Sequence, residues 1–175
     1  MKFRKLNADE IDVRIQSVKE KGLILLLYKD SRVDQRILDE TVGPMNWQRH
    51  HTRNNANCIV SIWDDDKKQW IEKEDTGVES YTEKEKGLAS DSFKRACFNW
   101  GIGRELYTSP FIWVNASDVN ITTKNGKSTC YEKFAVEKIA YNKLGNIDGL
   151  SIKSSTGKRV FVQHPKEKPK ERNND

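Results

Sequence analysis

Clustered acidic residues are the first feature of this sequence that could do chemistry. The run Asp64–Asp66 is soon followed by three more acidic residues before Thr76, and nucleases use clustered carboxylates to hold two Mg²⁺ ions. Consecutive side chains on an extended strand point to opposite faces, so three adjacent aspartates cannot all face one ion. The pattern therefore favours a solvated hairpin tip. A metal-dependent nuclease built on Asp64, Asp66 and Glu72 is the enzymatic alternative.

Histidine and cysteine offer little for a metal site or for nucleophilic catalysis. His50 and His51 are adjacent, so on an extended chain they point to opposite faces. Cys58, Cys97 and Cys130 lie far apart and lack the spacing of metal ligands. We therefore expect no bound metal, no other cofactor, and reduced thiols of the kind found in a cytosol.

Two glycine motifs match nucleotide-binding signatures only in part. Gly126-Lys127-Ser128 ends like a P-loop, but the first glycine of that motif would fall at Ile121. Asn125-Gly126 is instead a favoured hairpin turn. Gly101-Ile102-Gly103 follows a helical pattern, whereas a dinucleotide fingerprint follows a strand. We predict a turn and a helix end, and the sequence gives no support for ATP-driven chemistry.

The basic side chains could bind a polyanion. The formal charge is +5, yet residues 54–80 hold 3 basic and 7 acidic side chains, so the rest of the chain carries +9. Cations spaced along a groove neutralise phosphates without reading bases. The alternative is that they lie on solvated helix faces. The candidates occupy predicted helices or their ends: Arg32, Arg36, Lys84, Lys86, Lys94, Arg95 and Arg104.

The spacing of apolar residues predicts the elements that hold these cations. A capping box at Asn7 and Glu10, followed by apolar residues at helical spacing from position 11 on, predicts a helix that starts at this box and continues through about residue 21. Residues 23–28 read as a buried strand, and residues 31–42 as a helix stopped by Gly43-Pro44. Residues 46–76 read as a strand meander with an acidic hairpin tip.

A long helix is predicted next, from about Thr82 to Trp100. Its apolar stripe contains Phe93 and Cys97, while Lys94 and Arg95 lie off the stripe and Arg95 can pair with an aspartate at position 91. Strand patterns at 133–142, 147–154 and 158–163 predict a small antiparallel meander. The predicted class is therefore α+β. The predicted parts are a core at 1–130, an extension of the same domain at 131–163 and a disordered polar tail at 164–175.

No apolar run approaches the ~18 residues of a membrane span, and no signal-peptide core follows the charged N-terminus. We therefore expect a cytoplasmic protein.

Three ordered motifs resemble the single-strand annealing proteins of the Rad-fifty-two/Rad-twenty-two family, in its phage or prophage form. The first is the end of a helix followed by Val42-Gly-Pro-Met-Asn-Trp47. The second is Glu74-Asp-Thr-Gly77 after a hairpin. The third is the helix with Ala89-x-Asp-x-x-Lys-Arg-Ala96, then an aromatic residue and Gly-Ile-Gly-Arg-x-Leu-Tyr107. The resemblance covers about residues 24–113.

The resemblance implies a fold and a function. The fold is an antiparallel β-meander packed against a long helix, a β-β-β-α core. The function is binding of single-stranded DNA and annealing of complementary strands without ATP, in recombination and repair, by a homo-oligomeric ring or filament. Lys94 and Arg95 match the family's paired basic residues, and Arg32 is a weaker match. Some members carry another basic residue where this chain has Phe98.

By the same resemblance the expected partners are single-stranded DNA, the annealed duplex, a phage exonuclease and the single-strand-binding protein of a bacterial host. The expected protein is not an enzyme. Two alternatives stay open: a module that coats single strands or DNA ends without annealing them, and the nuclease described above. An annealing protein and a strand-coating module need the same basic groove, so the sequence does not separate these two hypotheses.

Overall fold

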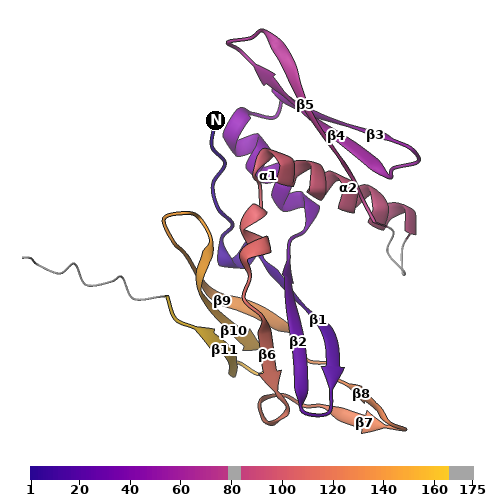
Figure 1. The fold of residues 1–175 in the computed structure, drawn as a ribbon, viewed down its shortest axis with the longest axis vertical. Helices are drawn as coiled ribbons and strands as arrows, with labels where there is room; N and C mark the ends of the chain where they lie inside the picture. Colours follow the sequence, from indigo (N-terminus) through magenta and orange to yellow (C-terminus); the bar gives the residue numbers. More distant parts are fainter. Residues whose placement is uncertain (79–83, 166–175) are drawn as a thin grey trace, which may run out of the picture. The chain divides into compact units, whose positions relative to one another are not determined.

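The chain folds into two compact units, each assembled from separate stretches of sequence (Figure 1). The computed structural model describes residues 1–78 and 84–165, with only the backbone described at 84–86. The first unit comprises Met1–Leu6 and Lys29–Arg104, and the second comprises Asn7–Tyr28 and the chain from Glu105 onward. The described part contains two α-helices and antiparallel sheets, so the predicted α+β class is confirmed.

The first unit contains both α-helices and a three-stranded sheet. Its elements in chain order are α1 (Ser31–Val42), β3 (Trp47–Thr52), β4 (Asn57–Asp64), β5 (Gln69–Thr76) and α2 (Lys84–Trp100). The strands pair antiparallel in the order β3-β4-β5. The predicted hairpin at the acidic segment is confirmed, and the predicted start of the long helix at about Thr82 lies outside the described residues.

Helix α1 begins and ends where the sequence provides caps. The Asp30 side chain accepts a hydrogen bond of 2.8 Å from the Arg32 backbone N–H, so the N-cap is Asp30. At the other end Gly43 takes a positive φ of 85°, which glycine adopts at little cost. The predicted helix and its stop are both confirmed.

Strand register decides which side chains face α2. The residues of β3, β4 and β5 that lie opposite one another share a face of the sheet, and two such rows are Trp47–Ile62–Ile71 and Arg49–Val60–Lys73. On α2 the side chains of Phe93, Ala96 and Cys97 are fully buried. Helix α2 contacts β4 and β5, Trp47 stacks on Phe93 with ring centroids 6.1 Å apart, and the Trp100 indole N–H donates to the Val60 carbonyl at 3.0 Å.

The glycine motif at 101–103 ends α2. The Gly101 N–H donates to the Phe98 carbonyl and the Ile102 N–H to the Cys97 carbonyl, the paired hydrogen bonds of a Schellman motif with Gly101 at positive φ. The predicted helix end is therefore confirmed. Gly103 has a second role, because a Cβ at this position would lie 2.2 Å from Cε of the buried Lys29.

The second unit is built on a six-stranded antiparallel sheet. Its strands are β1 (Asp12–Lys19), β2 (Gly22–Tyr28), β6 (Ile112–Asn115), β9 (Phe134–Tyr141), β10 (Ile147–Ser154) and β11 (Arg159–Gln163). They pair in the order β11-β10-β9-β1-β2-β6. The outer strands β11 and β6 contact each other, so the sheet is a nearly closed barrel.

Short elements connect the strands of the barrel. They are the 3₁₀ turns η1 (Ala8–Glu10), η2 (Arg104–Thr108) and η3 (Ala116–Asp118), and a separate hairpin formed by β7 (Thr122–Lys124) and β8 (Lys127–Thr129). Asn125 and Gly126 both take positive φ between β7 and β8, so the prediction of a hairpin turn in place of a P-loop is confirmed.

The helix predicted from the capping box at Asn7 to about residue 21 is wrong. The capping box at Asn7 and Glu10 is present, but it holds only the single 3₁₀ turn η1, and the chain continues as β1. The physical reason is strand pairing, since β1 forms a hairpin with β2 and pairs on its other edge with β9, which is more than 100 residues away in sequence. Val13 and Ile15 also alternate with polar residues, and β-branched residues at period two favour a strand.

The predicted C-terminal meander is present as β9, β10 and β11, but it is not a separate sheet. Strands β1, β2 and β6, from the first 130 residues, complete the same barrel. The tail predicted to be disordered lies outside the described residues from position 166. No helix in the described part of the chain is long and apolar enough to cross a bilayer.

Candidate nucleic-acid interface

Lys94 and Arg95, the two adjacent cations of the third motif, lie on different sides of α2. Successive residues of an α-helix are about 100° apart. Lys94 is half-buried near the start of α1, where its charge acts on the carboxylates of Asp30 and Asp34. Among the described residues no hydrogen bond or ion pair engages the Lys94 ammonium, so its charge is available to a ligand.

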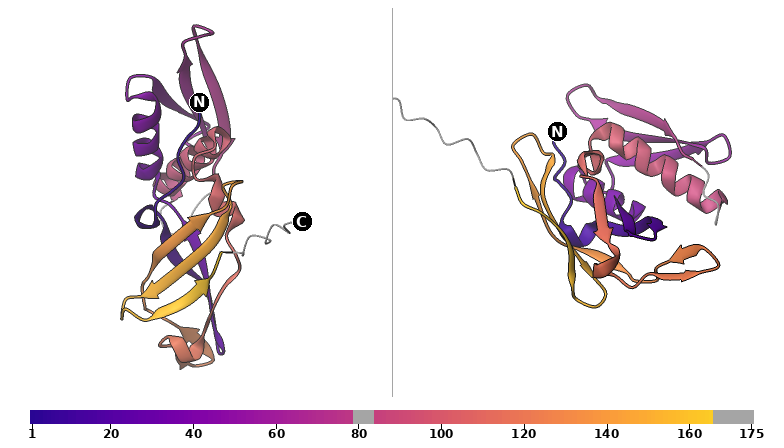
Figure 2. Two further views of the ribbon diagram at one scale, coloured as in Figure 1. Left: turned by 90° about the vertical axis from the view of Figure 1, so that its left-hand side faces the viewer. Right: turned by 60° about the horizontal axis from the view of Figure 1, so that its bottom comes forward.

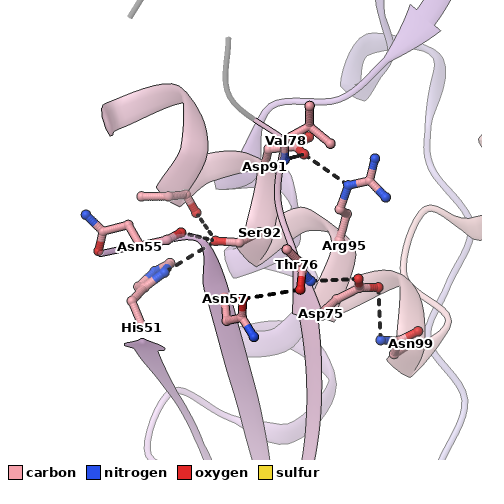
Figure 3. Close-up of polar contacts among 11 residues, drawn as sticks. His51, Asn55, Asn57, Asp75, Thr76, Val78, Asp91, Ser92, Arg95 and Asn99 are labelled. Atoms are coloured by element: carbon pink, nitrogen blue, oxygen red, sulfur yellow. Dashed lines mark hydrogen bonds and ion pairs between the residues drawn. The ribbon is translucent and has the colours of Figure 1, made fainter. Parts of the chain in front are cut away.

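Arg95 is held by a carboxylate of α2 itself (Figure 3). Its Nε donates to Asp91 Oδ2 at 3.0 Å, the i,i+4 pair that the sequence predicts. The same carboxylate oxygen accepts the Val78 N–H at 2.9 Å. The Arg95 side chain is 38% exposed, so a phosphate can reach it only in competition with Asp91.

The α1 candidates are surface residues. The Arg32 side chain is 82% exposed and pairs with Asp30 at 3.0 Å. Hydrogen bonds from Arg32 lower the pKa of Asp30. Arg36 lies one turn further along and is exposed. The side chains of Lys84 and Lys86, also candidates, lie outside the described residues.

Arg104 closes the C-terminal end of α2. Its guanidinium donates to the Phe98 carbonyl at 3.1 and 2.7 Å and to the Asn99 carbonyl at 3.2 Å. A cation at a helix C-terminus satisfies free carbonyls and interacts favourably with the helix dipole. Arg104 therefore has a structural role beside any role in binding.

We expect Arg104→Gln to lower the free energy of unfolding by about 1 kcal/mol, because carbonyls of the last turn of α2 lose a charged donor. Urea unfolding followed by tryptophan fluorescence measures this change. Lys143→Gln, which removes an exposed charge from a loop of the second unit, is the control and should change stability by less than about 0.5 kcal/mol. An unchanged midpoint for Arg104→Gln would contradict the capping role.

Sequence reasoning missed two cations that flank α2 from the outer strands. The Arg49 guanidinium lies 4.7 Å from the centroid of the Phe93 ring. The Lys73 ammonium lies 4.7 Å from the Trp100 ring and donates to the Asn99 carbonyl at 2.7 Å. The alternation of side chains along a strand could have indicated both cations. Arg49 is two residues from Trp47 and so shares its face of the sheet, and Lys73 lies opposite Val60 in the register.

Polar contacts fix α2 on its sheet and so fix the positions of these cations (Figure 3). The buried Ser92 hydroxyl lies 3.0 Å from the Asn55 carbonyl oxygen and 3.4 Å from His51 Nδ1. At the C-terminal end of α2, the Asn99 amide donates to the Glu74 carbonyl at 3.0 Å and to an Asp75 carboxylate oxygen at 3.2 Å.

The acidic hairpin tip is held by its own local contacts. Asp64 accepts hydrogen bonds from the backbone N–H groups of Lys67 and Asp66, and the contacts with Lys67, followed by that with Asp66, lower the pKa of Asp64. Trp63 and Trp70 form the predicted cross-strand pair, edge to face at 5.6 Å. Residues 1–78 and 84–165 contain no group of three histidine, cysteine or acidic side chains that could hold a metal ion.

Cys58 and Cys97 are buried and free. Burial raises the pKa of both thiols, that of Cys58 to about 11, so neither is a nucleophile at neutral pH.

No protein-family model, no curated protein and no solved structure matches this chain. The features that bear on its function are therefore the three ordered motifs and the geometry around α2.

Proposed function

We propose that this protein binds single-stranded DNA and anneals complementary strands without ATP, in recombination and repair. The observation that carries the proposal is the placement of cations along both flanks of α2. Arg49 of β3 lies beside Phe93, and Lys94 of α2 lies near the start of α1. Lys73 of β5 contacts the end of α2, and Arg95 pairs with Asp91 on α2. Cations at fixed positions along one helix suit a phosphate backbone, which carries charge at regular intervals.

The order of the elements supports the same proposal. The resemblance implies three strands followed by a long helix, and β3, β4, β5 and α2 follow in that order. The motif at 42–47 joins α1 to β3, and the motif at 74–77 covers the end of β5. The motif at 89–107 forms α2 and its Schellman end. We propose that the first unit is the β-β-β-α core of the annealing family.

In the proposed mechanism the protein does no covalent chemistry. The cations hold one strand by its phosphates and leave its bases free to test a second strand. Stacking in the new duplex, worth about 1.4 kcal/mol per base-pair step, drives the reaction. The protein contributes by lowering the repulsion between the two phosphate backbones and by ordering the first strand before pairing.

Assembly into a ring or filament is part of the proposal. The outer strands β3 and β5 each have only one partner strand among the described residues, and an unpaired strand edge can accept another chain. Head-to-tail contacts between copies produce rings or helical filaments. A phage exonuclease and a host single-strand-binding protein are the proposed protein partners, in the cytoplasm of a bacterial host.

The test is the annealing rate of two complementary labelled oligonucleotides, with and without protein, in the absence of ATP and across a salt series. We expect the protein to accelerate annealing and the acceleration to fade as salt rises, because the contacts are electrostatic. Binding without acceleration would favour a module that coats single strands. No binding to either strand would overturn the proposal.

A further inference from the structure

The β7–β8 hairpin has a charge arrangement that its own fold does not explain. Lys124 and Lys127 lie directly opposite each other in the register, on either side of the Asn125-Gly126 turn. Like charges directly opposite on neighbouring strands destabilise the pair. In an antiparallel pair such residues have Cα atoms only about 5.5 Å apart. The tip thus concentrates positive charge where a purely structural hairpin gains nothing from it.

No carboxylate nearby in the sequence compensates these lysines. Residues 119–131 contain no acidic side chain. The acids that flank this segment are already engaged: Asp118 pairs with Lys158 at 2.9 Å, and Glu132 accepts the Asn120 N–H at 2.6 Å. Within the described part of the chain neither Lys124 nor Lys127 makes a salt bridge.

Hydroxyl side chains flank the two lysines, and the Thr129 hydroxyl donates to the Thr122 carbonyl at 3.2 Å. Thr122 and Thr129 share a face with the two lysines, while Thr123 and Ser128 lie on the other face with their hydroxyl oxygens 3.0 Å apart. Every residue from 122 to 127 is exposed, and the hairpin stands off the six-stranded sheet of the second unit (Figure 2). A two-stranded hairpin alone is marginally stable in water, so bound ligand would also stabilise it.

We propose that the β7–β8 hairpin binds the backbone of duplex DNA through Lys124 and Lys127. Ammonium and hydroxyl donors are the groups that contact phosphate oxygens, and a two-stranded ribbon fits the major groove, which is about 12 Å wide. Residues 122–129 contain no aromatic side chain on which an unpaired base could stack, so this hairpin has no feature that favours a single strand over a duplex. The inference rests on the proposed function in one respect, since it takes the annealed product as the ligand.

The test compares Lys124→Gln/Lys127→Gln with the wild-type protein in binding a labelled duplex and a labelled single strand of the same sequence. Both substitutions leave the Asn125-Gly126 turn unchanged and remove a repulsive pair, so the hairpin should fold. We expect duplex affinity to fall about tenfold at low salt, and the log–log salt slope for the duplex to decrease by about 1.8, or 0.9 for each of two phosphate contacts. Single-strand affinity should change less than twofold.

The matched control is Lys67→Gln/Lys68→Gln, at the tip of the β4–β5 hairpin. It removes the same charge, but these lysines pair with Asp64 and Asp65 at 3.2 and 3.4 Å, so duplex binding should stay at the wild-type level. Unchanged duplex affinity in the β7–β8 variant, an equal loss for duplex and single strand, or no duplex binding by the wild type would overturn the inference. If the wild type binds duplex DNA but does not anneal strands, the proposed function is overturned. The comparison of duplex affinity between the β7–β8 variant and the wild type still tests the role of the hairpin.

Discussion

Replacing Lys29 by methionine is expected to destabilise the first unit by about 3–5 kcal/mol. The Lys29 ammonium and the Asp34 carboxylate form an ion pair whose side chains are 1% and 0% exposed. The Lys29 ammonium also lies 4.6 Å from the centroid of the Phe98 ring. Asp34 Oδ2 has no hydrogen-bond partner among the described residues. Without Lys29 the buried carboxylate loses its main compensating charge, and this loss sets the size of the effect.

Urea unfolding followed by tryptophan fluorescence measures this change, because four of the five tryptophans lie in the first unit. The double variant Lys29→Met/Asp34→Leu is the control, since replacing a whole buried pair by apolar side chains is often neutral or stabilising. We expect it to recover most of the loss. A single variant that costs less than about 1 kcal/mol would show that water reaches Asp34 in solution.

The same pair predicts a pH dependence. Burial raises the pKa of Asp34 to about 6, against the opposing effect of Lys29. A carboxyl group with a raised pKa in the folded state binds its proton more tightly when folded. Its contribution to stability is therefore complete below about pH 4 and is lost as pH rises through 6. The stability difference between the wild type and Asp34→Asn should change by up to about 1.4 kcal/mol per pH unit in this window.

Local patterns predicted the elements whose contacts are local. The stripe on α2, the hairpin at 57–76 and the stop at Gly43 all follow from residues that are neighbours in sequence. The segment from 11 to 21 did not, because a capping box and three apolar residues fit one helical turn and a strand equally well until the partner strand is known. The pairing of β1 with β9, which places β1 inside the barrel, spans more than 100 residues, and no local pattern encodes it.

The candidate interface was predictable to the same extent. The Asp91–Arg95 pair follows from i,i+4 spacing, and the placement of Lys94 off the apolar stripe follows from the helical period. The burial of Lys29 has no signature, because a lysine beside charged residues is normally solvated. The capping role of Arg104 depends on how the chain turns after Gly101. This turn brings the guanidinium back to carbonyls at the end of α2, and the sequence pattern alone does not predict that contact.

Lys94→Ala/Arg95→Ala is expected to give the largest loss of single-strand binding. Two lost phosphate contacts should flatten the log–log salt slope by about 1.4, or 0.7 for each contact on a single strand, and lower affinity at least about tenfold at low salt. The first unit should stay folded, because the stripe that α2 buries is formed by Phe93, Ala96 and Cys97. Circular dichroism and the urea midpoint check this point.

The two cations should not contribute equally. Lys94 has no ion pair among the described residues, whereas Arg95 already donates to Asp91, so a phosphate that binds Arg95 must displace or share that carboxylate. We therefore expect Lys94→Ala alone to cause most of the loss in fluorescence anisotropy titrations. Asp91→Asn should strengthen single-strand binding, because it removes one carboxylate that competes with phosphate for Arg95. Wild-type affinity and salt slope in the double variant would remove both residues from the interface and transfer the assignment to Arg49 and Lys73.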